Sequence, residues 1–435
     1  MKISGWGRYP VKDVRVYKPT IISDIQEYLT KHEDAQFIAR GLGRSYGDSA
    51  MGDTVISTRW LDHILAFDRQ TGILCCSSGA SLAQLLEIFV PEGWFLPVTP
   101  GTKLVTVGGA IASDVHGKNH HVSGCFCDHV DSFDVLVGEG EIVRCSRTEH
   151  SDLFHATCGG MGLTGIILSV KLRLKPVKSA FIEQTTFKAD NLAHVLELFE
   201  AQAGSTYSVA WIDCVSGGRN LGRSLLMTGE HSDHGGLGFK ASSGIGLPFE
   251  MPSVLLNRFS VKTFNTLYYH RVHSRQEKRH IYYAPFFYPL DSISDWNRMY
   301  GKNGFTQYQF VIPKAAGPEG LGRILKTIVG SGLGSFLAVL KVFGDENDNL
   351  LSFPMEGYTL ALDFKIEPEL FELLERLDQM VLEYGGRIYL AKDVRMSAAV
   401  FRKSYHGIES FQAVRELYGT KGKFVSFQSK RLGLD

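Results

Sequence analysis

Three glycine-rich segments, at residues 41–47, 101–117 and 159–165, alternate with apolar runs in the first 170 residues of the chain. Glycine allows the backbone to approach a ligand closely, and successive free backbone N–H groups form a concavity that binds anions. Each segment alone is also compatible with an ordinary tight turn. Because three of them occur between predicted strands in one half of the chain, they together predict a binding site for the pyrophosphate of a nucleotide cofactor.

The spacing of these glycines excludes the common dinucleotide-binding fingerprint. The first segment, GLGRSYG at 41–47, has one residue too many for the pattern G-x-G-x-x-G. The third segment contains GMGLTG at 160–165, which matches the pattern but follows a predicted helix and precedes a predicted strand. The fingerprint needs the strand first, so that the helix N-terminus meets the pyrophosphate. We therefore reject a Rossmann-type NAD site.

Composition limits the class of protein. The 435 residues contain 46 Lys plus Arg against 46 Asp plus Glu, and 44% are apolar. A chain this apolar can bury a core, and at ~150 residues per domain its length predicts two or three domains. Balanced charge provides no basic field for phosphate backbones, so we expect no nucleic-acid partner. Seven cysteines, an odd number, indicate reduced thiols. With no signal-peptide or membrane-spanning pattern, we expect a cytoplasmic enzyme, free or held peripherally at the inner membrane face.

The second half of the chain has a different pattern. Residues 183–215 and 305–365 contain alternating strand-like runs, separated by predicted helices at about 316–330 and 366–384. This pattern indicates an antiparallel sheet with helices on one face. Residues 216–281 are predicted to be irregular, with a mobile Gly- and Ser-rich loop. The tail from residue 385 is predicted to begin with a strand, RIYLAKDV, and to continue as a helix.

Specific segments resemble a known family. RGLGRSYGDSA, VTPGTKLVTVGGAIASDVHGKNHH and CGGMGLTGIILSV resemble the FAD-binding half of the vanillyl-alcohol-oxidase superfamily, and WNRMYG, TQYQFVIP, LSFP and YLAKDVR extend the resemblance over nearly the whole chain. It implies an α+β, two-domain FAD fold with an antiparallel-sheet substrate domain. The implied domains are an FAD-binding domain at 1–178, a substrate-binding domain at 179–386 with a mobile region at 216–281, and a C-terminal segment at 387–435 that returns to the FAD domain.

The resemblance implies FAD as the cofactor and assigns residues to it. Those expected to contact FAD are Gly41, Gly43, Arg44, Ser45, Tyr46, Gly47, Gly101, Thr102, Thr106, Gly108, Ala112, His116, Gly117, Ile166 on the adenine side, Tyr389 and Lys392. Many superfamily members attach FAD covalently through a histidine in the first glycine segment. Positions 43–46 contain no histidine here, so we expect FAD to be bound non-covalently.

Oxidation of a secondary alcohol by flavin needs a group that handles the hydroxyl proton or balances charge. The residues expected to serve the chemistry are Lys392, His116 and Tyr46. The resemblance places Lys392 between flavin and sugar, where it acts either as a fixed charge or as a base. The alternative is a strand-end lysine that reaches solvent. For His116, a structural role, substrate positioning and base catalysis all stay open. Tyr46 and Tyr389 are expected to shape the pocket.

Substrate contacts are expected from the second half of the chain. Gln307 and Gln309 are two residues apart in the strand FTQYQFVIP, so both amides point to one face. Lys341 interrupts the uncharged run FLAVLKVFG and needs an anionic partner, such as a substrate phosphate, unless it lies at a solvent-facing edge. The resemblance adds Trp211, Phe287 and Ala361. At the last two positions the mycobacterial-type enzymes carry a tyrosine and a cysteine, which bears on the choice of substrate.

A metal site is an alternative for one cluster. His116, His120, His121, Cys125, Cys127 and His129 fall within fourteen residues. Zinc prefers four N or S ligands, but the C-x-C-x-H run has no matching second half and Gly117 argues against a helix. We therefore expect no metal and keep structural zinc as the alternative.

The resemblance predicts an FAD-dependent oxidoreductase of the CH–OH group. It would oxidise the 2′-hydroxyl of a polyprenyl-phosphoryl pentose of the ribose type to a 2′-keto sugar, the first half of an epimerisation to the arabinose form used in cell walls. A separate NADH-dependent keto-reductase would complete the epimerisation. The alternatives are an alditol or aldonolactone oxidase acting on a soluble sugar, and a non-catalytic flavoprotein or lipid-binding partner subunit. Residues expected to meet anionic lipid are Lys262, Tyr268, Tyr269, His270, Arg271, Arg275, Lys278 and Arg279.

Overall fold

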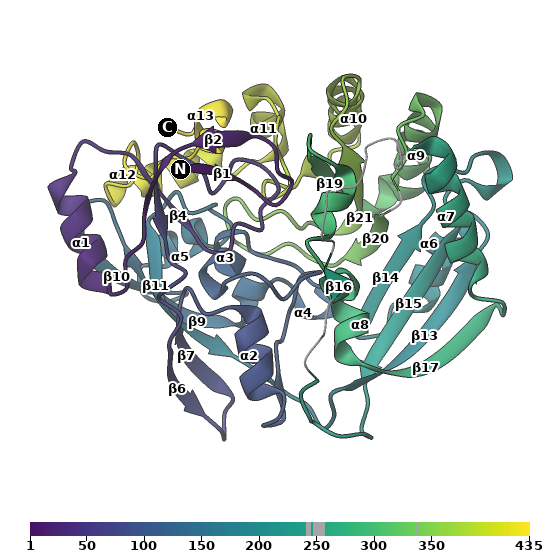
Figure 1. Ribbon diagram of the computed structural model, residues 1–435, viewed down its shortest axis with the longest axis horizontal. Helices are drawn as coiled ribbons and strands as arrows, with labels where there is room; N and C mark the ends of the chain where they lie inside the picture. The colour runs from purple at the N-terminus through teal and green to yellow at the C-terminus, as the bar shows by residue number, and fades with distance from the viewer. Residues whose placement is uncertain (241–244, 247–256, 336) are drawn as a thin grey trace.

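Strand pairing arranges the chain in two groups of sheets, which lie side by side in Figure 1. The computed structural model describes residues 1–240, 245–246, 257–335 and 337–435. The first group, at the left of the view, contains the N-terminal elements, and the C-terminal helices pack on it. The second group contains one large sheet built from residues 181–388.

The first group combines a parallel and an antiparallel sheet. In the parallel sheet, β5 (Thr54–Ser57) lies between β3 (Arg15–Tyr17) and β4 (Phe37–Arg40). The antiparallel sheet has the order β10 (Ile142–Ser146), β9 (Val130–Leu136), β11 (Ile166–Arg173), β7 (Ile73–Ser77) and β6 (Ile64–Asp68). Shorter pairs join β1 (Lys2–Ser4) to β2 (Val11–Asp13) and β8 (Trp94–Phe95) to β12 (Lys175–Pro176). β9 and β10 form a hairpin around the turn GEG at 138–140.

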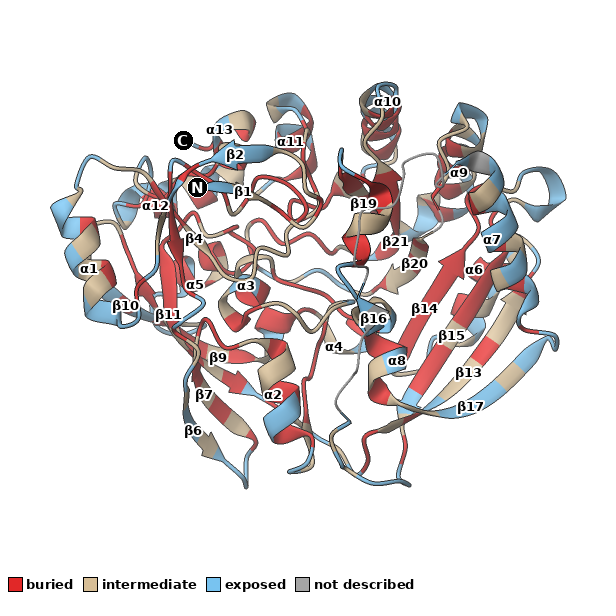
Figure 2. Cartoon of the chain, viewed as in Figure 1, coloured by how far each residue is buried: buried red, intermediate tan, exposed pale blue. Residues whose placement is uncertain are grey.

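The second group is an antiparallel sheet of eight strands among the described residues. Its order is β17 (Gln276–Tyr282), β13 (Phe181–Ala189), β15 (Ser224–His231), β14 (Tyr207–Ile212), β20 (Ala338–Phe343), β21 (Gly357–Lys365), β19 (Phe305–Pro313) and β22 (Arg387–Ile388). Next to it, β16 (Ile245–Gly246) pairs in parallel with β18 (Ile293–Ser294). Figure 2 shows the central strands β14 and β15 largely buried, whereas the edge strand β17 is largely exposed.

Helices cover both groups of sheets. Those of the first group are α1 (Ile22–Lys31), α2 (Leu82–Phe89), α3 (Val107–Ala112), α4 (His120–Ser123), α5 (Ser151–Thr157), α11 (Ala398–Ser404), α12 (Ile408–Leu417) and α13 (Phe427–Leu432). On the large sheet lie α6 (Leu192–Ala201), α7 (Arg258–His270), α8 (Tyr283–Phe287), α9 (Gly317–Ser331) and α10 (Leu370–Glu383). The sequence explains their starts: Ser81 caps α2 by accepting from Gln84 N at 3.1 Å, and Asn191 caps α6 in the same way.

The α+β class and the antiparallel second sheet are confirmed, but two local predictions are wrong. RIYLAKDV forms a strand only as far as Ile388, because the Asp393 carboxylate accepts the backbone N–H groups of Arg395 and Met396 and stabilises a turn instead. Residues 216–281 are not irregular where they are described, since β15, α7 and β17 fall there. The largely buried run SLLM begins β15, which pairs with β13 on one side and β14 on the other despite the glycines nearby. Part of the predicted mobile loop, 241–244 and 247–256, lies outside the described residues.

The C-terminal tail returns to the first group of sheets. Phe37 in β4 forms an isolated parallel bridge with Phe424, and its backbone N–H donates to Lys423 O at 2.8 Å. We therefore keep the boundaries 1–178, 179–386 and 387–435 as proposed domains. Within the described residues, no helix combines the length and apolar character needed to cross a bilayer.

Candidate active site

The three glycine segments converge on α3, which lies within the second of them. Thr106 caps α3, and a Cβ on Gly41 of the first segment would be only 2.2 Å from Thr106 Oγ1. In the third segment, Gly159 N donates to Ile111 O at 3.0 Å and Met161 N donates to Ala112 O at 2.8 Å. A side chain at Gly41 would separate the first two segments, so glycine is needed there for the approach. The predicted convergence is confirmed.

Buried polar atoms without partners border this junction. Among the described residues, Ser49 Oγ, Ser78 Oγ and His116 Nδ1 are buried and make no hydrogen bond. Ser49 follows the first segment, Ser78 O accepts from Gly108 N at 2.8 Å, and His116 follows α3. Buried polar groups are normally paired, so these atoms fit a bound group rich in oxygen and nitrogen. The glycine junction and the unpaired donors together fit FAD.

The residues predicted to contact FAD occupy three places. Gly41, Gly43, Arg44, Ser45, Tyr46 and Gly47 follow β4; Gly101, Thr102, Thr106, Gly108, Ala112, His116 and Gly117 lie before, in and after α3; Tyr389 and Lys392 lie in the turn after β22. This turn meets the first segment, because Tyr46 N donates to Ala391 O at 3.0 Å. Tyr389 OH donates to Ser113 O at 2.9 Å beside α3. Ile166 is fully buried with Phe37 and Leu136, so its contact with adenine stays a prediction.

One face of the large sheet carries the predicted substrate side chains. The register pairs Trp211 with Val339, Val339 with Ala361 and Ala361 with Gln309. Paired residues point to the same face, and so do residues two apart in a strand. This face therefore holds Trp211, Gln307, Gln309, Lys341 and Ala361. The neighbouring residue Tyr308 points the other way and donates to Asp378 of α10 at 3.0 Å, so the predicted alternation in this strand is confirmed.

Hydrogen-bond directions on this face fix the state of His116. Thr359 Oγ1 donates to Phe310 O at 2.8 Å, so Thr359 must accept from Gln309 Nε2 at 3.2 Å. Gln309 Nε2 then also donates to His116 Nε2 at 3.0 Å. His116 Nε2 is thus an acceptor and the neutral ring carries its proton on Nδ1. Burial, reinforced by the Lys341 charge, holds the His116 pKa well below its usual value. This geometry makes His116 a hydrogen-bond donor and argues against its role as a base.

Lys392 lies beside Tyr46. Its Nζ is 4.0 Å from the centroid of the Tyr46 ring, and Tyr46 OH is 3.4 Å from Gln307 Nε2. Burial lowers the Lys392 pKa, and the nearby Asp363 carboxylate opposes that shift. Burial raises the Tyr46 pKa well above its usual value, so this phenol stays protonated. Lys392 and Tyr46, two of the three residues predicted to serve the chemistry, therefore lie together between the first glycine segment and the large sheet.

A second cationic region forms around Lys341. Lys118, which follows Gly117, donates to Phe286 O and lies 4.7 Å from the Phe286 ring centroid. Burial lowers the pKa of Lys341 to about 7, and the Lys392 charge contributes to this shift. Burial also lowers the pKa of Lys118 to about 7, and the Lys341 charge contributes there. Neither lysine forms an ion pair with a carboxylate in the described part of the chain. Two lysines with mutual repulsion and no anion are the expected lining of a phosphate site.

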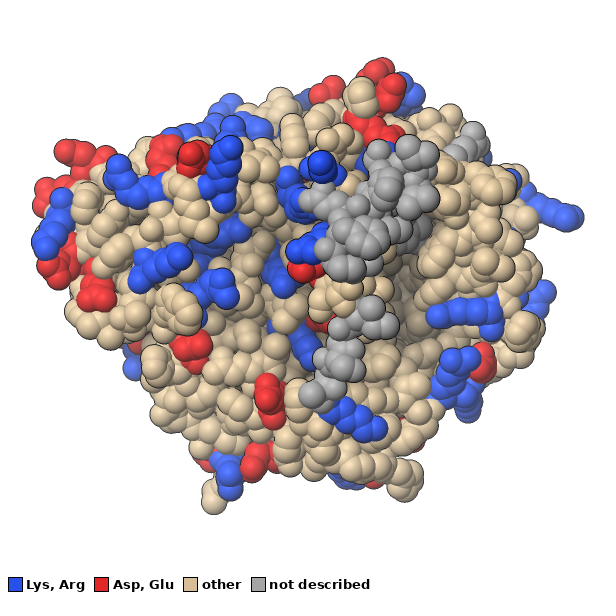
Figure 3. Space-filling model, viewed as in Figure 1, with Lys and Arg blue, Asp and Glu red and all other residues tan. Residues whose placement is uncertain are grey.

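Aromatic side chains close the site. Phe287 on α8 is 1% exposed and packs edge-on against Tyr207 of β14, with ring centroids 4.9 Å apart. Trp211 packs against Tyr268 of α7 at 4.8 Å. These contacts place α7 and α8 over the face that carries the substrate residues. On the side of the molecule drawn in Figure 3, Lys and Arg side chains border the depression between the two groups of sheets.

The histidine and cysteine cluster does not gather around one point. His121 Nε2 bonds to Ser205 O and His129 Nε2 to Ser123 O, each at 2.9 Å. His120 Nδ1 accepts from Gly344 N at 3.1 Å. Within the described ranges, no three His, Cys, Asp or Glu side chains are placed to hold a metal ion.

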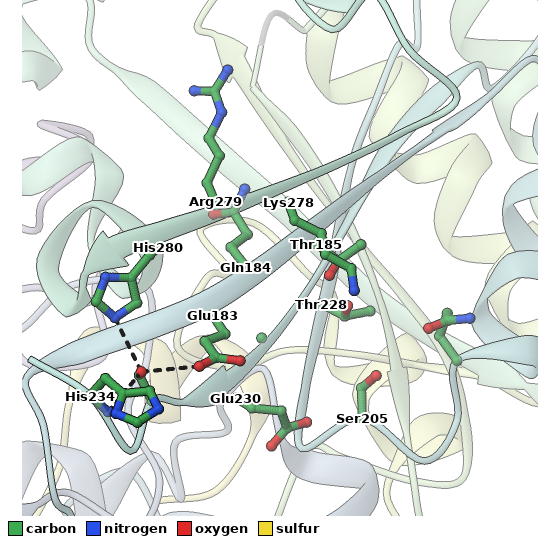
Figure 4. Close-up of a pocket in the computed structure, with 13 residues that line it drawn as sticks. Glu183, Gln184, Thr185, Ser205, Thr228, Glu230, His234, Lys278, Arg279 and His280 are labelled. Atoms are coloured by element: carbon green, nitrogen blue, oxygen red, sulfur yellow. Dashed lines mark hydrogen bonds between the residues drawn. The ribbon is translucent and has the colours of Figure 1, made fainter.

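A separate hollow lies on the opposite face of the large sheet. Its volume is about 590 Å³, and Glu183, Thr185 and Thr228 contribute to its lining (Figure 4). Thr228 pairs with Ser208, whose side chain points away from the face of Trp211. The Ser232 hydroxyl bonds to Glu183 and His280 at 3.1 Å each. This hollow contains none of the predicted site residues and is not the active site.

Comparison with known proteins follows this geometry. Residues 15–146 match a family described as an FAD binding domain. Over the full chain, 37% of residues are identical to decaprenylphosphoryl-beta-D-ribose oxidase of Mycolicibacterium smegmatis, of which 97% is covered. The chain belongs to the decaprenylphosphoryl-beta-D-ribose oxidase family. An uncharacterized protein of Streptomyces coelicolor is 28% identical over 81% of this chain and 100% of its own length. Delta(24)-sterol reductase of Homo sapiens is 30% identical over 26% of this chain and 22% of its own length.

Membership in the decaprenylphosphoryl-beta-D-ribose oxidase family, with the FAD binding match, establishes an FAD-dependent oxidoreductase. Two residues of its site were not predicted from the sequence. Lys118 directly follows His116 and Gly117, so its place at the end of the second glycine segment was an available signal. Asp363 interrupts the apolar run GYTLALDF, just as Lys341 interrupts the run FLAVLKVFG. A charged residue in such a run needs a partner, so this pattern was an available signal for Asp363 as well.

Proposed function

We propose that this protein oxidises the 2′-hydroxyl of a polyprenyl-phosphoryl pentose of the ribose type to a 2′-keto sugar. The similarity over the whole chain to an oxidase named for decaprenylphosphoryl ribose carries the proposal. The paired Lys118 and Lys341 support it, because an alditol or aldonolactone has no phosphate for them to bind. A non-catalytic flavoprotein would not need a buried lysine beside Tyr46.

Lys392 acts through its charge, whereas His116 and Tyr46 act through hydrogen bonds. FAD, when bound, accepts the hydride that leaves the carbon bearing the hydroxyl. Lys392 supplies a fixed positive charge close to Tyr46, which stabilises the negative charge that develops in the reaction. His116 donates from Nδ1, and Tyr46, held by Gln307, orients a polar group of the substrate. The hydroxyl proton leaves to solvent or through Tyr46, since His116 Nε2 is already occupied.

Substrate recognition follows from the same face of the sheet. Lys118 and Lys341 would hold the phosphate that links sugar and lipid. Gln309 is occupied by Thr359 and His116, so it positions the imidazole more than the sugar. Ala361 and Phe287 remove a thiol and a phenol relative to the mycobacterial-type pocket, and they leave a more apolar wall. The proposed pocket therefore recognises the phosphate by charge and the sugar by shape.

Flavin reduction by defined substrates tests this function. The holoprotein is mixed anaerobically with a short-chain polyprenyl-phosphoryl ribose, with free ribose or with an alditol, and flavin absorbance is followed. Bleaching by the lipid-linked sugar alone, with a 2′-keto product by mass spectrometry, is the expected result. Bleaching by the free sugars would favour the soluble-sugar oxidase. No bleaching by any of them would favour a non-catalytic flavoprotein.

Two partners complete the proposal. A 2′-keto sugar is an intermediate of epimerisation, so a separate NADH-dependent keto-reductase would consume the product. The second partner is the membrane that holds the lipid. On α7, Phe259 and Leu267 are 80% and 68% exposed, and the helix contains no acidic residue. Its opposite side is buried through Val261, Asn265 and Tyr269. An apolar side flanked by Lys262 and Arg271 fits an anionic lipid surface.

Vesicle binding tests the membrane contact. Wild-type protein is expected to sediment with vesicles that contain phosphatidylglycerol and much less with phosphatidylcholine alone. Phe259→Ser with Leu267→Ser should lose most of this binding, and Lys262→Glu with Arg271→Glu should lose its dependence on anionic lipid. The matched control is Leu417→Ser, a 71% exposed leucine on α12. Equal binding by wild type and both double variants would exclude α7 as the contact.

A further inference from the structure

Asp363 is a buried carboxylate that the roles described above do not use. It lies on β21, is 1% exposed, and accepts hydrogen bonds from Gln307 Nε2 at 2.5 Å and from Tyr300 OH at 3.4 Å. Its backbone N–H is held by Ser335 Oγ and Leu337 O. A buried carboxylate is costly unless hydrogen bonds and a nearby positive charge stabilise it. The register places it on the face that carries the substrate residues, paired with Gln307.

The carboxylate fixes the orientation of two neighbouring side chains. Burial raises the Asp363 pKa to about 7, and the hydrogen bond from Gln307 opposes this shift. When ionised, the carboxylate only accepts hydrogen bonds, so the Gln307 amide turns its NH₂ group toward Asp363 Oδ1, 2.5 Å away. The second hydrogen of that NH₂ group points to Tyr46 OH, 3.4 Å away. Tyr46 oxygen is then an acceptor from Gln307, and its own O–H is left to donate into the active site. Asp363 therefore determines which way the Tyr46 hydroxyl donates.

The same carboxylate is the negative charge that balances Lys392. The charged and titratable groups around Lys392 are Lys341 on β20, His116 after α3, Tyr46 in the first glycine segment and Asp363 on β21. Asp393, the next residue in the chain, is paired with Arg431 at 2.8 Å. Lys341 repels Lys392, and His116 is neutral. Within the described residues, Asp363 is thus the carboxylate that favours the protonated form of Lys392.

We propose that Asp363 is a positioning residue of the active site, which directs the Tyr46 hydroxyl through Gln307 and keeps Lys392 protonated as its counter-charge. The inference rests on the proposed function in assigning the chemistry to the surroundings of Lys392. Its test uses the bound flavin without any sugar, so it can fail independently of the choice of substrate.

The flavin reduction potential of the holoprotein, measured against reference dyes from pH 6 to 9, reads the charge at Lys392. Wild-type Asp363 is mostly protonated at pH 6 and gains its negative charge as pH rises through about 7, whereas Asp363→Asn carries no charge at any pH. The potential of the variant should therefore match the wild-type value at pH 6 and exceed it once wild-type Asp363 ionises. The difference should shrink again at higher pH, where Lys392 loses its proton in the variant before it does in wild type. Gln307→Met removes the hydrogen bond that most lowers the Asp363 pKa, so the ionisation of Asp363 near pH 7 should move to higher pH, while substrate reduction slows.

Asp378→Asn is the matched control. Asp378 is also 1% exposed and also accepts from a tyrosine, Tyr308, but it lies behind β19 and pairs with Arg395 at 2.6 Å. Burial raises the Asp378 pKa to about 6, so this variant should differ from wild type by a constant between pH 7 and 9. If Asp363→Asn does not fold, Lys392→Met tests the same interaction from the side of the cation. Loss of the Lys392 charge raises the Asp363 pKa, so the pH-dependent step in the flavin potential should move to higher pH. A pH-independent difference in the folded variants would overturn the proposal.

Discussion

Lys392 shows how one side chain can combine packing with charge. Its side chain packs beside Tyr46, with Nζ 4.0 Å from the ring centroid. Gln307 bonds to both the Tyr46 hydroxyl and the Asp363 carboxylate, and so connects this packing to the negative charge. Lys392→Met keeps the length and the apolar stem but removes the charge. FAD binding should survive, while flavin reduction by the lipid-linked pentose should slow by about 10²-fold or more. Anaerobic stopped-flow spectroscopy at saturating substrate measures this rate.

The pH profile of the remaining rate separates the two roles of Lys392. If the charge is what matters, the alkaline fall in the wild-type rate should follow Lys392 deprotonation and disappear in Lys392→Met. Lys403→Met, on an exposed turn of α11, is the control for loss of a surface lysine. An unchanged reduction rate in Lys392→Met would remove this residue from the mechanism.

Lys341 and Lys118 should make substrate affinity depend on pH. Burial lowers both pKa values to about 7, so the lysines carry charge below pH 7 and lose it above. A phosphodiester keeps one negative charge throughout this range. Affinity for a short-chain polyprenyl-phosphoryl ribose should therefore fall as pH rises from 6 to 9. Lys341→Met should weaken binding at pH 6 by about tenfold or more and flatten this dependence.

Calorimetric titration at several pH values measures that affinity. Lys326→Met, an exposed lysine on α9, should bind like wild type at each pH. The prediction fails if Lys341→Met shows the wild-type pH dependence, because the titrating group would then lie elsewhere.

At the scale of elements, the first glycine segment depends on its distance from α3. A Cβ on Gly41 would be 2.2 Å from Thr106 Oγ1, and Thr106 cannot rotate away without losing the cap it gives to Gly109 N at 3.2 Å. Gly41→Ala should cost about 1–3 kcal/mol of stability and reduce FAD content. Gly204→Ala is the matched control, because a Cβ there meets no atom within 4 Å and Gly204 is not among the residues assigned to FAD. Thermal unfolding and the flavin-to-protein absorbance ratio measure both effects.

The same segment predicts how FAD is held. Between Gly43 and Tyr46 the chain offers no histidine, and Arg44 stacks on Trp6 with 3.9 Å from guanidinium carbon to ring centroid. Acid precipitation of the holoprotein should therefore leave the yellow colour in the supernatant. A yellow pellet would show a covalent bond to another residue.

Local patterns predicted these elements well where neighbours in sequence decide the structure. The alternation of FTQYQFVIP sets the faces of Gln307 and Tyr308 without knowledge of other strands. The turn at Lys392 depends on how Asp393 bonds to the following backbone, and apolar content alone suggested a strand. Asp363 and Gln307 are far apart in sequence, and only the register of β19 and β21 makes them a pair. This contact across strands explains why the role of Asp363 was missed.

At the scale of the whole molecule, the C-terminal tail is tied to the cofactor half by Arg415. This arginine is fully buried, and burial lowers its pKa to about 10, so it stays charged at neutral pH. It donates to Leu163 O in the third glycine segment at 3.1 Å, to Phe424 O at 3.0 Å and to Leu434 O. One side chain thus connects α12, the chain end and the segment that packs on α3.

Arg415→Met should destabilise both the tail and the FAD site. Each buried carbonyl left without a donor costs about 1–3 kcal/mol, so the total loss should be at least about 3 kcal/mol. Arg415→Lys keeps the charge but not the forked geometry, so its stability should lie between those of wild type and Arg415→Met. Unfolding is followed in parallel by circular dichroism and by the rise in fluorescence of released FAD. Arg376→Met, an exposed arginine on α10, should leave both midpoints unchanged. If 387–435 belongs to the FAD domain, both midpoints fall together in Arg415→Met, whereas FAD release at the wild-type temperature would place the tail outside that unit.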